Sequence, residues 1–359
     1  MPKKTVIPFG PQHPILPEPI HLDLVLEDEK VVDALPSIGY VHRGLEKLVE
    51  KREFTEYVYV IERICGICSF IHGLSYCQAI EEIMGIDVPE RARFIRTMGS
   101  EYSRTHSHLL ILGCIADGMG FENLFMGLWK ARERVLNRME ESFGGRIIQG
   151  TCKIGGVKKD ITGETLDKMI IELDAIDREM KEMTEILLKD DAVRHRLKKV
   201  GYISRDDAYH LGAVGPTARG SGVRIDMRER GYAAYDKIKF APVLESGGDC
   251  YARTAVRVGE LFQSTDIIRQ CIRKMPDGPT ETKVIGNPSG EYASRVEQPR
   301  GEAVHYAKAN GTRYLSRFRI RTPTFANIPP LVEMLRGCEL ADVPVIILSM
   351  DPCISCTER

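Results

Sequence analysis

The chain has 359 residues, with 50 lysines and arginines against 51 aspartates and glutamates, so its formal net charge is −1. This length is sufficient for a large buried interior, since single cores stop growing only near about 250 to 300 residues. A strongly basic chain would be attracted to the phosphate backbone, and this chain is not basic. No nucleic-acid partner is therefore expected.

The first residues, MPKKTVIPFGPQHP, lack the pattern of a secretory leader, and the chain contains 10 cysteines. We therefore expect the chain in a reducing compartment, the cytoplasm, where thiols bind metals or take part in redox chemistry more often than they form disulfides. The longest apolar runs, at 109–116 and 343–350, are shorter than the roughly 20 residues of a spanning helix. Any membrane association is expected to come through a partner.

Periodicity in the first half of the chain predicts a hairpin followed by helices. Residues 20–34 alternate apolar and polar around an acidic turn, which indicates a β-hairpin with one buried face. From Arg43 the pattern changes to helical periods. These predict four helices in succession, over 44–62, 69–84, 89–117 and 121–142.

The second half predicts two more long helices, at 162–189 and about 248–274, separated by a glycine-rich irregular segment at 212–231. A domain usually keeps such a segment only for a site or an interface. Asn310-Gly311 between two alternating runs predicts a hairpin with a type I′ turn. A helix at 327–336 and a short buried strand at 343–350 complete the predicted elements.

These elements predict a mainly α fold with small peripheral antiparallel β-sheets. No internal repeat, low-complexity tract or linker divides the chain. We expect one domain over 1–359, consisting of an N-terminal hairpin region (1–42), a helical core (43–275) and a C-terminal hairpin, helix and metal-binding end (276–359).

Two CxxC pairs lie near opposite ends of the chain: Cys65 and Cys68 in RICGICSFIH, and Cys353 and Cys356 in DPCISC. Two such turns together form a tetrathiolate that suits soft or borderline metal ions. A structural zinc site and a thiol–disulfide motif use the same spacing. Zinc ribbons, however, usually place their pairs about 15 to 20 residues apart, whereas nearly the whole chain separates these. This separation favours a site with a chemical role.

Polar residues flank both pairs. His72 follows Cys68 by four residues, so it lies on the same helical face and can hydrogen-bond a sulfur. Arg63 precedes the first pair and is a candidate to hold a carboxylate or a cofactor ligand. Asp351 precedes Cys353 and places a carboxylate beside the second turn. The other cysteines lack pair spacing and are expected to be buried small hydrophobes.

The first pair with its flanks resembles the RxCGxCxxxH signature of nickel-iron hydrogenase large subunits, and DPCISC resembles their DPCxxC signature. The resemblance covers essentially the full chain. GPQHP and HSHLL resemble the energy-converting, membrane-associated (Ech-type) branch, which is related to the quinone-site large subunit of complex I. Other segments that carry the resemblance are RGLE at 43–46, PRG at 299–301 and RTPTFAN at 321–327.

This resemblance implies the large helical core of the family and a nickel-iron centre whose iron carries one CO and two cyanides. By the family pattern, Cys65 and Cys353 are terminal nickel ligands, while Cys68 and Cys356 bridge nickel to iron. Thiolates are soft donors that suit nickel. The protein's part is to pack and hydrogen-bond around the diatomic ligands.

The same resemblance implies roles for residues outside the cysteine pairs. Arg300 matches an arginine held above the open metal position, where it acts with Asp351 on H2; a strand-edge arginine is the alternative. Pro323 and Thr324 match the pocket that receives a cyanide, although Thr is also a common N-cap. Glu18 resembles a glutamate that relays protons from a terminal nickel thiolate. An exposed loop glutamate is the alternative for Glu18.

Glu46 in RGLE matches a carboxylate that binds an additional Mg or Fe ion in many relatives, together with a histidine near the C-terminus. This sequence has Arg359 in that region. An ion pair between Arg359 and Glu46 is therefore the alternative to a further metal. His106 and His108 in RTHSHLL are expected to be hydrogen-bonded core histidines.

The resemblance implies reversible oxidation of H2 by a catalytic subunit. It also implies a small partner subunit with an iron-sulfur cluster, further hydrophilic and integral membrane subunits, a ferredoxin-like electron donor and a place at the cytoplasmic face of the cell membrane. Two alternatives are a non-catalytic complex I-like quinone-site subunit, which should lack the four cysteines, and a structural tetrathiolate zinc protein.

Overall fold

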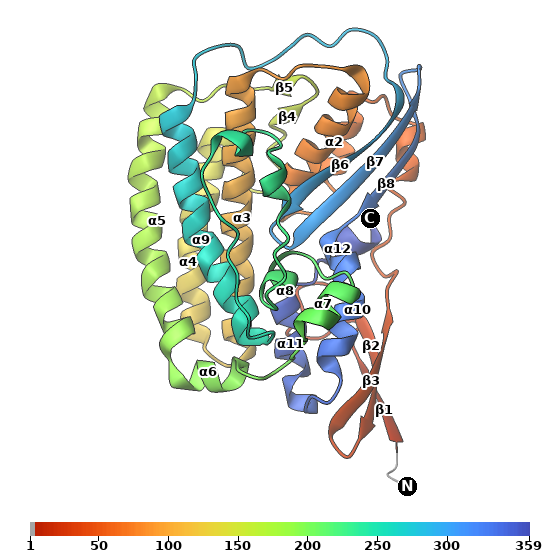
Figure 1. The fold of residues 1–359 in the computed structure, drawn as a ribbon, viewed down its shortest axis with the longest axis vertical. Coiled ribbons are helices and arrows are strands. Elements are labelled where there is room, and N and C mark those ends of the chain that lie inside the picture. Colours follow the sequence, from red (N-terminus) through yellow and green to blue (C-terminus); the bar gives the residue numbers. More distant parts are fainter. Residues whose placement is uncertain (1–3) are drawn as a thin grey trace.

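The computed structural model describes residues 4–359 and has a mainly α fold with small antiparallel sheets at its periphery, as predicted (Figure 1). Four long helices stand side by side and form the helical core. α3 packs against α4 and α9, and α5 packs against the same two helices. The four helices are α3 (Glu90–Gly118), α4 (Glu122–Phe143), α5 (Gly163–Lys189) and α9 (Cys250–Lys274).

The periodic pattern explains where α5 begins and which face it buries. Thr162 is its N-cap, and the Thr162 hydroxyl accepts a hydrogen bond from the Thr165 amide. Met169, Leu173 and Ile176 recur at three- and four-residue steps and are buried. No helix within residues 4–359 is both long and apolar enough to cross a membrane.

Buried charges line the contact between α3 and α9. Glu101 of α3 accepts a hydrogen bond from Ser264 Oγ of α9 at 2.6 Å. Glu260 of α9 accepts from His108 Nε2 at 2.9 Å and from Arg219 Nη2 at 2.6 Å. His108 is thus a hydrogen-bonded core histidine, as expected. Every one of these side chains is fully buried and paired, which is the condition for keeping charges inside a core.

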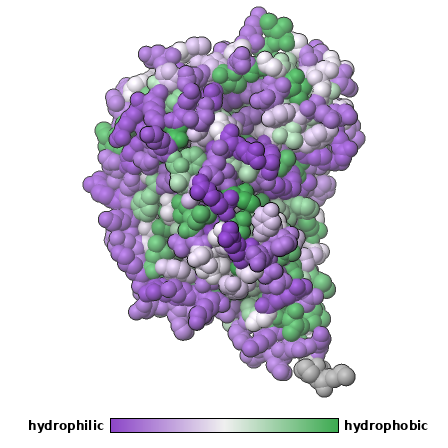
Figure 2. All heavy atoms as spheres, in the orientation of Figure 1, coloured by the Kyte–Doolittle hydropathy of each residue, from purple (hydrophilic) through white to green (hydrophobic). Residues whose placement is uncertain are grey.

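The N-terminal sheet has the order β1–β2–β3 and confirms the hairpin predicted at 20–34. Leu22 and Leu24 of β2 are buried, whereas Val6 of β1 and Leu35 of β3 are 58% and 56% exposed. The sheet projects at the lower right of Figure 1, and Figure 2 shows apolar side chains over this part of a largely hydrophilic face. Its strands are β1 (Lys4–Phe9), β2 (His21–Glu27) and β3 (Lys30–Ser37).

The C-terminal sheet contains the hairpin predicted around Asn310, but the predicted type I′ turn is wrong. Asn310 remains in β7, and the loop covers residues 311–314. The Asn310 carboxamide oxygen accepts from the Thr312 amide (3.2 Å) and hydroxyl (2.7 Å), which stabilises the wider loop. The strands, in the order β6–β7–β8, are β6 (Ser289–Gln298), β7 (Gly301–Asn310) and β8 (Leu315–Arg321).

Short elements connect the core to the two sheets. The helices are α1 (Tyr57–Glu62), α2 (Ser69–Met84), α6 (Asp191–Leu197), α7 (Arg205–His210), α8 (Gly215–Arg219), α10 (Pro323–Leu335), α11 (Val343–Met350) and α12 (Ile354–Glu358). The small ribbon β4 (Cys152–Lys153) and β5 (Gly156–Val157) and the 3-10 turns Lys47–Glu50, Met227–Arg230, Tyr235–Lys237 and Leu340–Asp342 complete the fold.

Three predicted elements differ from the structure. The helix predicted over 44–62 is interrupted between a 3-10 turn at Lys47–Glu50 and α1. The strand predicted at 343–350 is the helix α11, because a short run buried on all sides has no periodicity that separates strand from helix. α10 begins at Pro323 and not at residue 327, with proline in the first turn, where its missing N–H has no cost.

Gly99 permits the close approach of α3 to α2, which begins directly after the first cysteine pair. A Cβ at position 99 would lie 2.1 Å from Cζ of the buried Phe70 ring. Gly99→Ala is expected to lower the free energy of unfolding by about 1 to 3 kcal/mol through overpacking. At an open helix position the same substitution would instead raise the free energy of unfolding by about 1 kcal/mol. Urea unfolding of both proteins measures the difference.

Gly163→Ala is the matched control, because a Cβ at the first position of α5 would meet nothing within 4 Å. This variant is expected to be neutral or slightly stabilising. Equal unfolding midpoints for the two variants would show that the Phe70 contact is not the constraint.

Candidate metal centre

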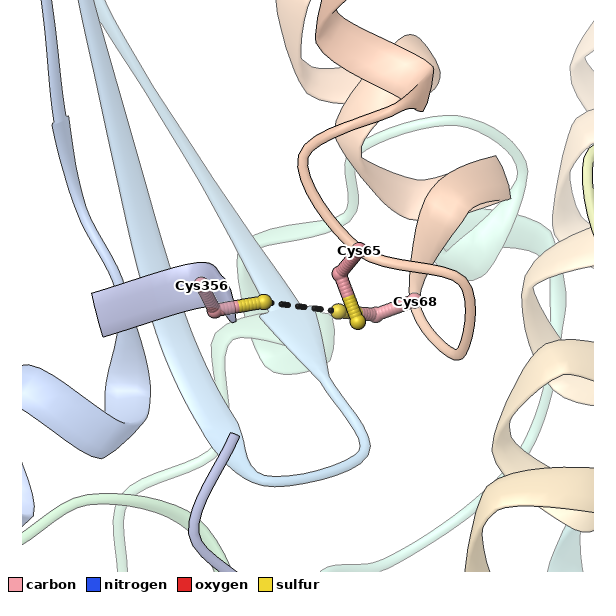
Figure 3. Close-up of side chains that lie close together, drawn as sticks. All are labelled: Cys65, Cys68 and Cys356. Carbon is pink, nitrogen blue, oxygen red and sulfur yellow. Dashed lines mark hydrogen bonds between the residues drawn. The ribbon is translucent and has the colours of Figure 1, made fainter. Parts of the chain in front are cut away.

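The two cysteine pairs, nearly 290 residues apart in sequence, meet in one place. Cys65 Sγ lies 3.3 Å from Cys353 Sγ, and Cys68 Sγ lies 3.2 Å from Cys356 Sγ, each pair being separated by 288 positions. The first turn joins α1 to α2, and the second joins α11 to α12. Figure 3 shows the Cys356 side chain pointing toward Cys65 and Cys68. All four cysteines are buried.

The arrangement fits a metal better than a disulfide. The sulfurs of Cys65, Cys68 and Cys356 all lie within 4.8 Å of one another. All four cysteines are free, and the short contacts run between the turns and not within either CxxC pair. These separations exceed the S–S bond length of about 2.05 Å. Four convergent sulfurs form the donor set that a soft or borderline metal requires.

The shifted pKa values of the clustered thiols also favour a bound cation. The pKa of the Cys68 thiol lies well below its ordinary value, because the neighbouring thiols of Cys353, Cys356 and Cys65 stabilise its thiolate. The pKa of the Cys356 thiol lies well above its ordinary value, because burial and its hydrogen bonds to the neighbouring sulfurs favour the neutral form. One thiolate is thus favoured, and further negative charge is resisted. A bound cation would stabilise all four as thiolates.

α3 holds the first cysteine turn from one side. The Ile67 amide donates to Cys65 Sγ at 3.2 Å, and the Ile67 carbonyl accepts from His106 Nε2 at 2.8 Å and from Ser103 Oγ at 3.3 Å. Burial, and then the positive charge of Arg132, lower the pKa of His106 to about 3, so this ring is neutral. His106 is therefore a hydrogen-bonded core histidine, as expected, and it orients the first turn.

Glu18 and Thr324 hold the second turn. The Glu18 carboxylate accepts from the Ile354 amide, from the Ser355 amide at 3.0 Å and from Ser355 Oγ at 2.5 Å. The Thr324 hydroxyl accepts from the Cys353 amide at 3.1 Å. Glu18 is therefore not a free loop residue, and Thr324 does not cap α10, whose N-cap is Thr322. Pro323 is buried in the first turn of α10 beside Thr324.

Arg43 ties the two turns together, a role that the sequence reasoning missed. Its guanidinium donates to the Ile64 carbonyl at 2.7 Å and to the Ser355 carbonyl at 3.1 Å. It also donates to the carbonyl of Arg63 at 3.0 Å. Arg43 lies in the same RGLE segment as Glu46, and that segment was the available signal.

Arg300 and Asp351 form a buried pair at the second turn. Arg300 Nη2 lies 2.8 Å from Asp351 Oδ1, Arg300 Nε donates to the Asp351 carbonyl at 3.0 Å, and Nη1 donates to Ser107 Oγ at 3.4 Å. Burial alone would lower the pKa of Arg300, but the charges of Asp351, Cys353 and Cys68 raise it well above its ordinary value. Arg300 is therefore a permanent cation beside the sulfurs.

Backbone geometry places both members of this pair. Asp351 ends α11 with a φ of 66°, a left-handed conformation that Asp tolerates better than most residues. Its Oδ2 atom is buried and has no hydrogen-bond partner in the described part of the chain. Gly215 and Gly301 both have positive φ, and a Cβ on Gly215 would lie 2.2 Å from the Arg300 carbonyl oxygen. The glycine-rich segment at 212–231 therefore packs directly against the turn between β6 and β7 that carries Arg300.

His72 lies where the sequence spacing placed it, with Nε2 3.3 Å from Cys356 Sγ. Its other ring nitrogen, Nδ1, is 3.1 Å from Nε2 of His305, a residue of β7 that the sequence reasoning did not identify. Arg63 is not brought to the site: its side chain is exposed, and its guanidinium donates to the Tyr59 carbonyl at 2.9 Å.

Glu46 forms the alternative ion pair with Arg359. Glu46 Oε1 accepts from Arg359 Nε at 2.9 Å and from the Ile320 amide at 2.8 Å, and Oε2 accepts from Arg319 Nη1 at 2.6 Å. Burial would raise the pKa of Glu46, but these donors outweigh it and the pKa is lowered. Both carboxylate oxygens are engaged, so this geometry favours the ion pair over a further metal.

Replacing Glu46 by glutamine is expected to lower the free energy of unfolding at neutral pH by about 1.5 to 3 kcal/mol, the usual value of hydrogen bonds to charged groups. A carboxylate with a lowered pKa stabilises the fold above its unfolded-state pKa, and this contribution is lost as the pH falls through the folded-state pKa. The difference between Glu46→Gln and the parent should therefore shrink in acid. Chemical unfolding at several pH values measures it.

Glu50→Gln is the matched control, since Glu50 pairs with Lys47 on the exposed surface. Exposed ion pairs of this kind contribute little to the free energy of unfolding. A Glu46→Gln effect that does not change with pH, or that equals the Glu50→Gln effect, would contradict the role of the buried ion pair.

Comparison with known proteins agrees with this geometry. A family model described as "Respiratory-chain NADH dehydrogenase, 49 Kd subunit" matches residues 118–285 and 281–359. Another, described as "Nickel-dependent hydrogenase", matches residues 43–112, which include the first cysteine pair. The two models together thus span most of the chain.

Individual relatives match over nearly the full chain. The carbon monoxide-induced hydrogenase of Rhodospirillum rubrum is 39% identical, covering 98% of this chain and 99% of the relative. The alpha subunit of the membrane-bound hydrogenase of Pyrococcus furiosus is 39% identical, covering 98% and 87%. One subunit of the NADH-quinone oxidoreductase of Clostridium beijerinckii is 32% identical, covering 99% and 98%. The chain therefore belongs to the family that unites nickel-iron hydrogenase large subunits of the energy-converting branch with the 49-kDa subunit of complex I.

Proposed function

We propose that this chain is the catalytic subunit of an energy-converting nickel-iron hydrogenase, which interconverts H2 with protons and electrons. The observation that carries the proposal is the convergence of four buried sulfurs from the two ends of the chain. A subunit that only binds quinone has no need of this tetrathiolate. The proposal therefore rests on the site and not on the family alone, because the family also contains complex I subunits.

In the proposed site, Cys65 and Cys353 are terminal nickel ligands, and Cys68 and Cys356 bridge to an iron with one CO and two cyanides. When bound, this centre supplies the position at which H2 is split and the electrons are accepted. The chain supplies a buried pocket in which the sulfurs are already gathered. The contacts from α3, Glu18 and Arg43 to the two turns keep their geometry fixed.

Arg300 and Asp351 are the proposed polar groups over the reacting position. Asp351 holds the Arg300 guanidinium through two contacts, so the cation keeps one orientation. A fixed, desolvated cation favours negative charge that develops beside it. The unpartnered Oδ2 of Asp351 is available to accept a proton. Pro323 and Thr324 form the proposed pocket for one cyanide, in which the Thr324 hydroxyl donates its hydrogen.

Glu18 is the proposed first proton carrier between the metal site and the outside. Its carboxylate accepts hydrogen bonds from the amides of Ile354 and Ser355, which directly follow Cys353. Pro11, His13 and Pro17 line a cavity of about 450 Å³ together with Glu18. A carboxylate between a buried thiolate and such a cavity is placed to take up a proton on one side and release it on the other.

Electrons are proposed to leave through an iron-sulfur cluster on a small partner subunit, because residues 4–359 contain no second group of candidate metal ligands. A ferredoxin-like carrier is the proposed electron donor. Further hydrophilic and integral membrane subunits are proposed to hold the chain at the cytoplasmic face of the membrane. The exposed Val6, Leu35 and Tyr40 form surface that a partner can cover. Residues 1–359 are proposed to act as one catalytic domain.

Infrared spectroscopy of the matured protein tests the function directly. Carbonyl and cyanide stretching bands, together with nickel in the metal analysis, are expected. Cys65→Ala should lose nickel and H2/D2 exchange, since one of four thiolates is removed. Cys77→Ala is the matched control: Cys77 is also buried but lies outside the cluster, so it should retain both.

Zinc alone, without diatomic bands, would instead indicate the structural zinc protein. Bound iron and nickel with normal exchange in Cys65→Ala would remove Cys65 from the ligand set.

Glu18→Gln should retain nickel but slow H2/D2 exchange, because an amide keeps the size of the side chain and cannot carry a proton. Metal content and exchange rate are measured on the same sample. Ser355→Ala removes one hydrogen bond to Glu18 while leaving the carboxylate in place, so it separates the loss of contact from the loss of the carboxyl group. Unchanged exchange in Glu18→Gln would exclude Glu18 from the proton path.

A further inference from the structure

A second histidine stands behind the one that contacts the cluster. Nε2 of His72 is 3.3 Å from Cys356 Sγ, and Nδ1 of His72 is 3.1 Å from Nε2 of His305. The ring centroids are 5.2 Å apart, and the ring planes differ by 16°. The 3.1 Å between the two nitrogens accounts for most of the 5.2 Å between the ring centroids, so the nitrogens lie on the line between the rings. The two rings therefore meet edge to edge in nearly one plane. This is the geometry of an N–H···N hydrogen bond.

The direction of these bonds follows from the sulfur. In its metal-binding form Cys356 is a thiolate, which can only accept a hydrogen bond. His72 Nε2 must then carry the proton and donate it, which leaves Nδ1 as the nitrogen that faces His305 Nε2. The donor to that nitrogen is His305 Nε2. The chain therefore runs in one direction, from His305 through His72 to Cys356.

The far side of His305 faces apolar side chains. His305 Nδ1 is buried and has no hydrogen-bond partner in the described part of the chain. The His305 ring packs edge-on against Phe318, with centroids 5.5 Å apart. A bare ring nitrogen tolerates these apolar surroundings better than an unpaired N–H. Burial, and then the nearness of His72, keep the pKa of His305 well below its ordinary value, so the ring has a single N–H.

We propose that His305 is a positioning residue of the metal centre, which fixes His72 in the tautomer that donates from Nε2 to the bridging sulfur of Cys356. The proposal rests on the proposed function. In this role the histidine pair holds the sulfur's hydrogen bond in place. Outer groups that orient a metal site's hydrogen bonds typically affect metal affinity or activity by about 10- to 100-fold.

Three substitutions in the matured holoenzyme separate hydrogen bonding from packing. His305→Phe keeps a ring but removes the donor, and His305→Gln places an amide N–H near the position of Nε2. Phe318→Leu changes the packing around His305, and around Tyr57 and Tyr76, without removing the donor. A hydrogen bond to a bridging thiolate withdraws electron density from the metals. Its loss should therefore move the carbonyl infrared band of His305→Phe to lower wavenumber, in the same direction as in His72→Phe. His305→Gln and Phe318→Leu should keep the parental band.

Each outcome decides the inference. An unshifted band in His305→Phe beside a shifted band in His72→Phe would overturn it, as would equal shifts in His305→Phe and Phe318→Leu. If His305→Phe fails to retain nickel while His305→Gln retains it, the retention of nickel depends on the N–H donor at position 305, which supports the proposal. Loss of nickel in both His305 variants and in Phe318→Leu would assign the effect to packing. A parent without carbonyl and cyanide bands would refute the proposed function itself, which is a distinct result.

Discussion

The convergence of four buried sulfurs from the two ends of the chain is the constraint on which this structure depends. The cross-turn pairs lie 3.2 and 3.3 Å apart, and the thiols of Cys68 and Cys356 have pKa values shifted in opposite directions. Such a cluster cannot carry four negative charges without a cation beside it. A metal bound at the cluster would therefore also stabilise the joining of the two ends of the chain. This coupling explains why so many neutral and cationic donors converge on the two turns.

The helical core acts as the rigid support of this cluster. α3 carries Ser103, His106 and Ser107, which contact the first turn or Arg300. The opposite face of the same helix is fixed to α9 by buried polar contacts: Glu101 accepts from Ser264, and Glu260 accepts from His108 and pairs with Arg104 at 3.7 Å. Since buried and paired charges tolerate little displacement, α3 cannot shift without breaking several interactions together. The site is thus held by a helix that several buried polar contacts fix in place.

Cations surround the cluster without replacing a metal. Arg300 is held by Asp351 beside the sulfurs, Arg43 binds carbonyls of both turns, and Arg359 binds Glu46 farther out. Guanidinium groups suit this task because they remain charged and present several donors in a fixed plane. The histidine pair adds a directional hydrogen bond to one sulfur. Positive charge and hydrogen bonds together lower the energy of thiolates in a buried pocket.

The amino-acid sequence by itself determined the class of fold, the long amphipathic helices and the two cysteine pairs that form the cluster, because helical periodicity and CxxC spacing are local properties. It also placed His72 correctly, since residues four apart share a helical face. Only the tertiary structure decided that residues 343–350 form a helix, that Arg63 lies away from the site, and that Arg43 and His305 lie at it. These features depend on contacts between segments far apart in sequence. A run buried on all sides, or a histidine in a strand, has no local pattern that reveals its partner.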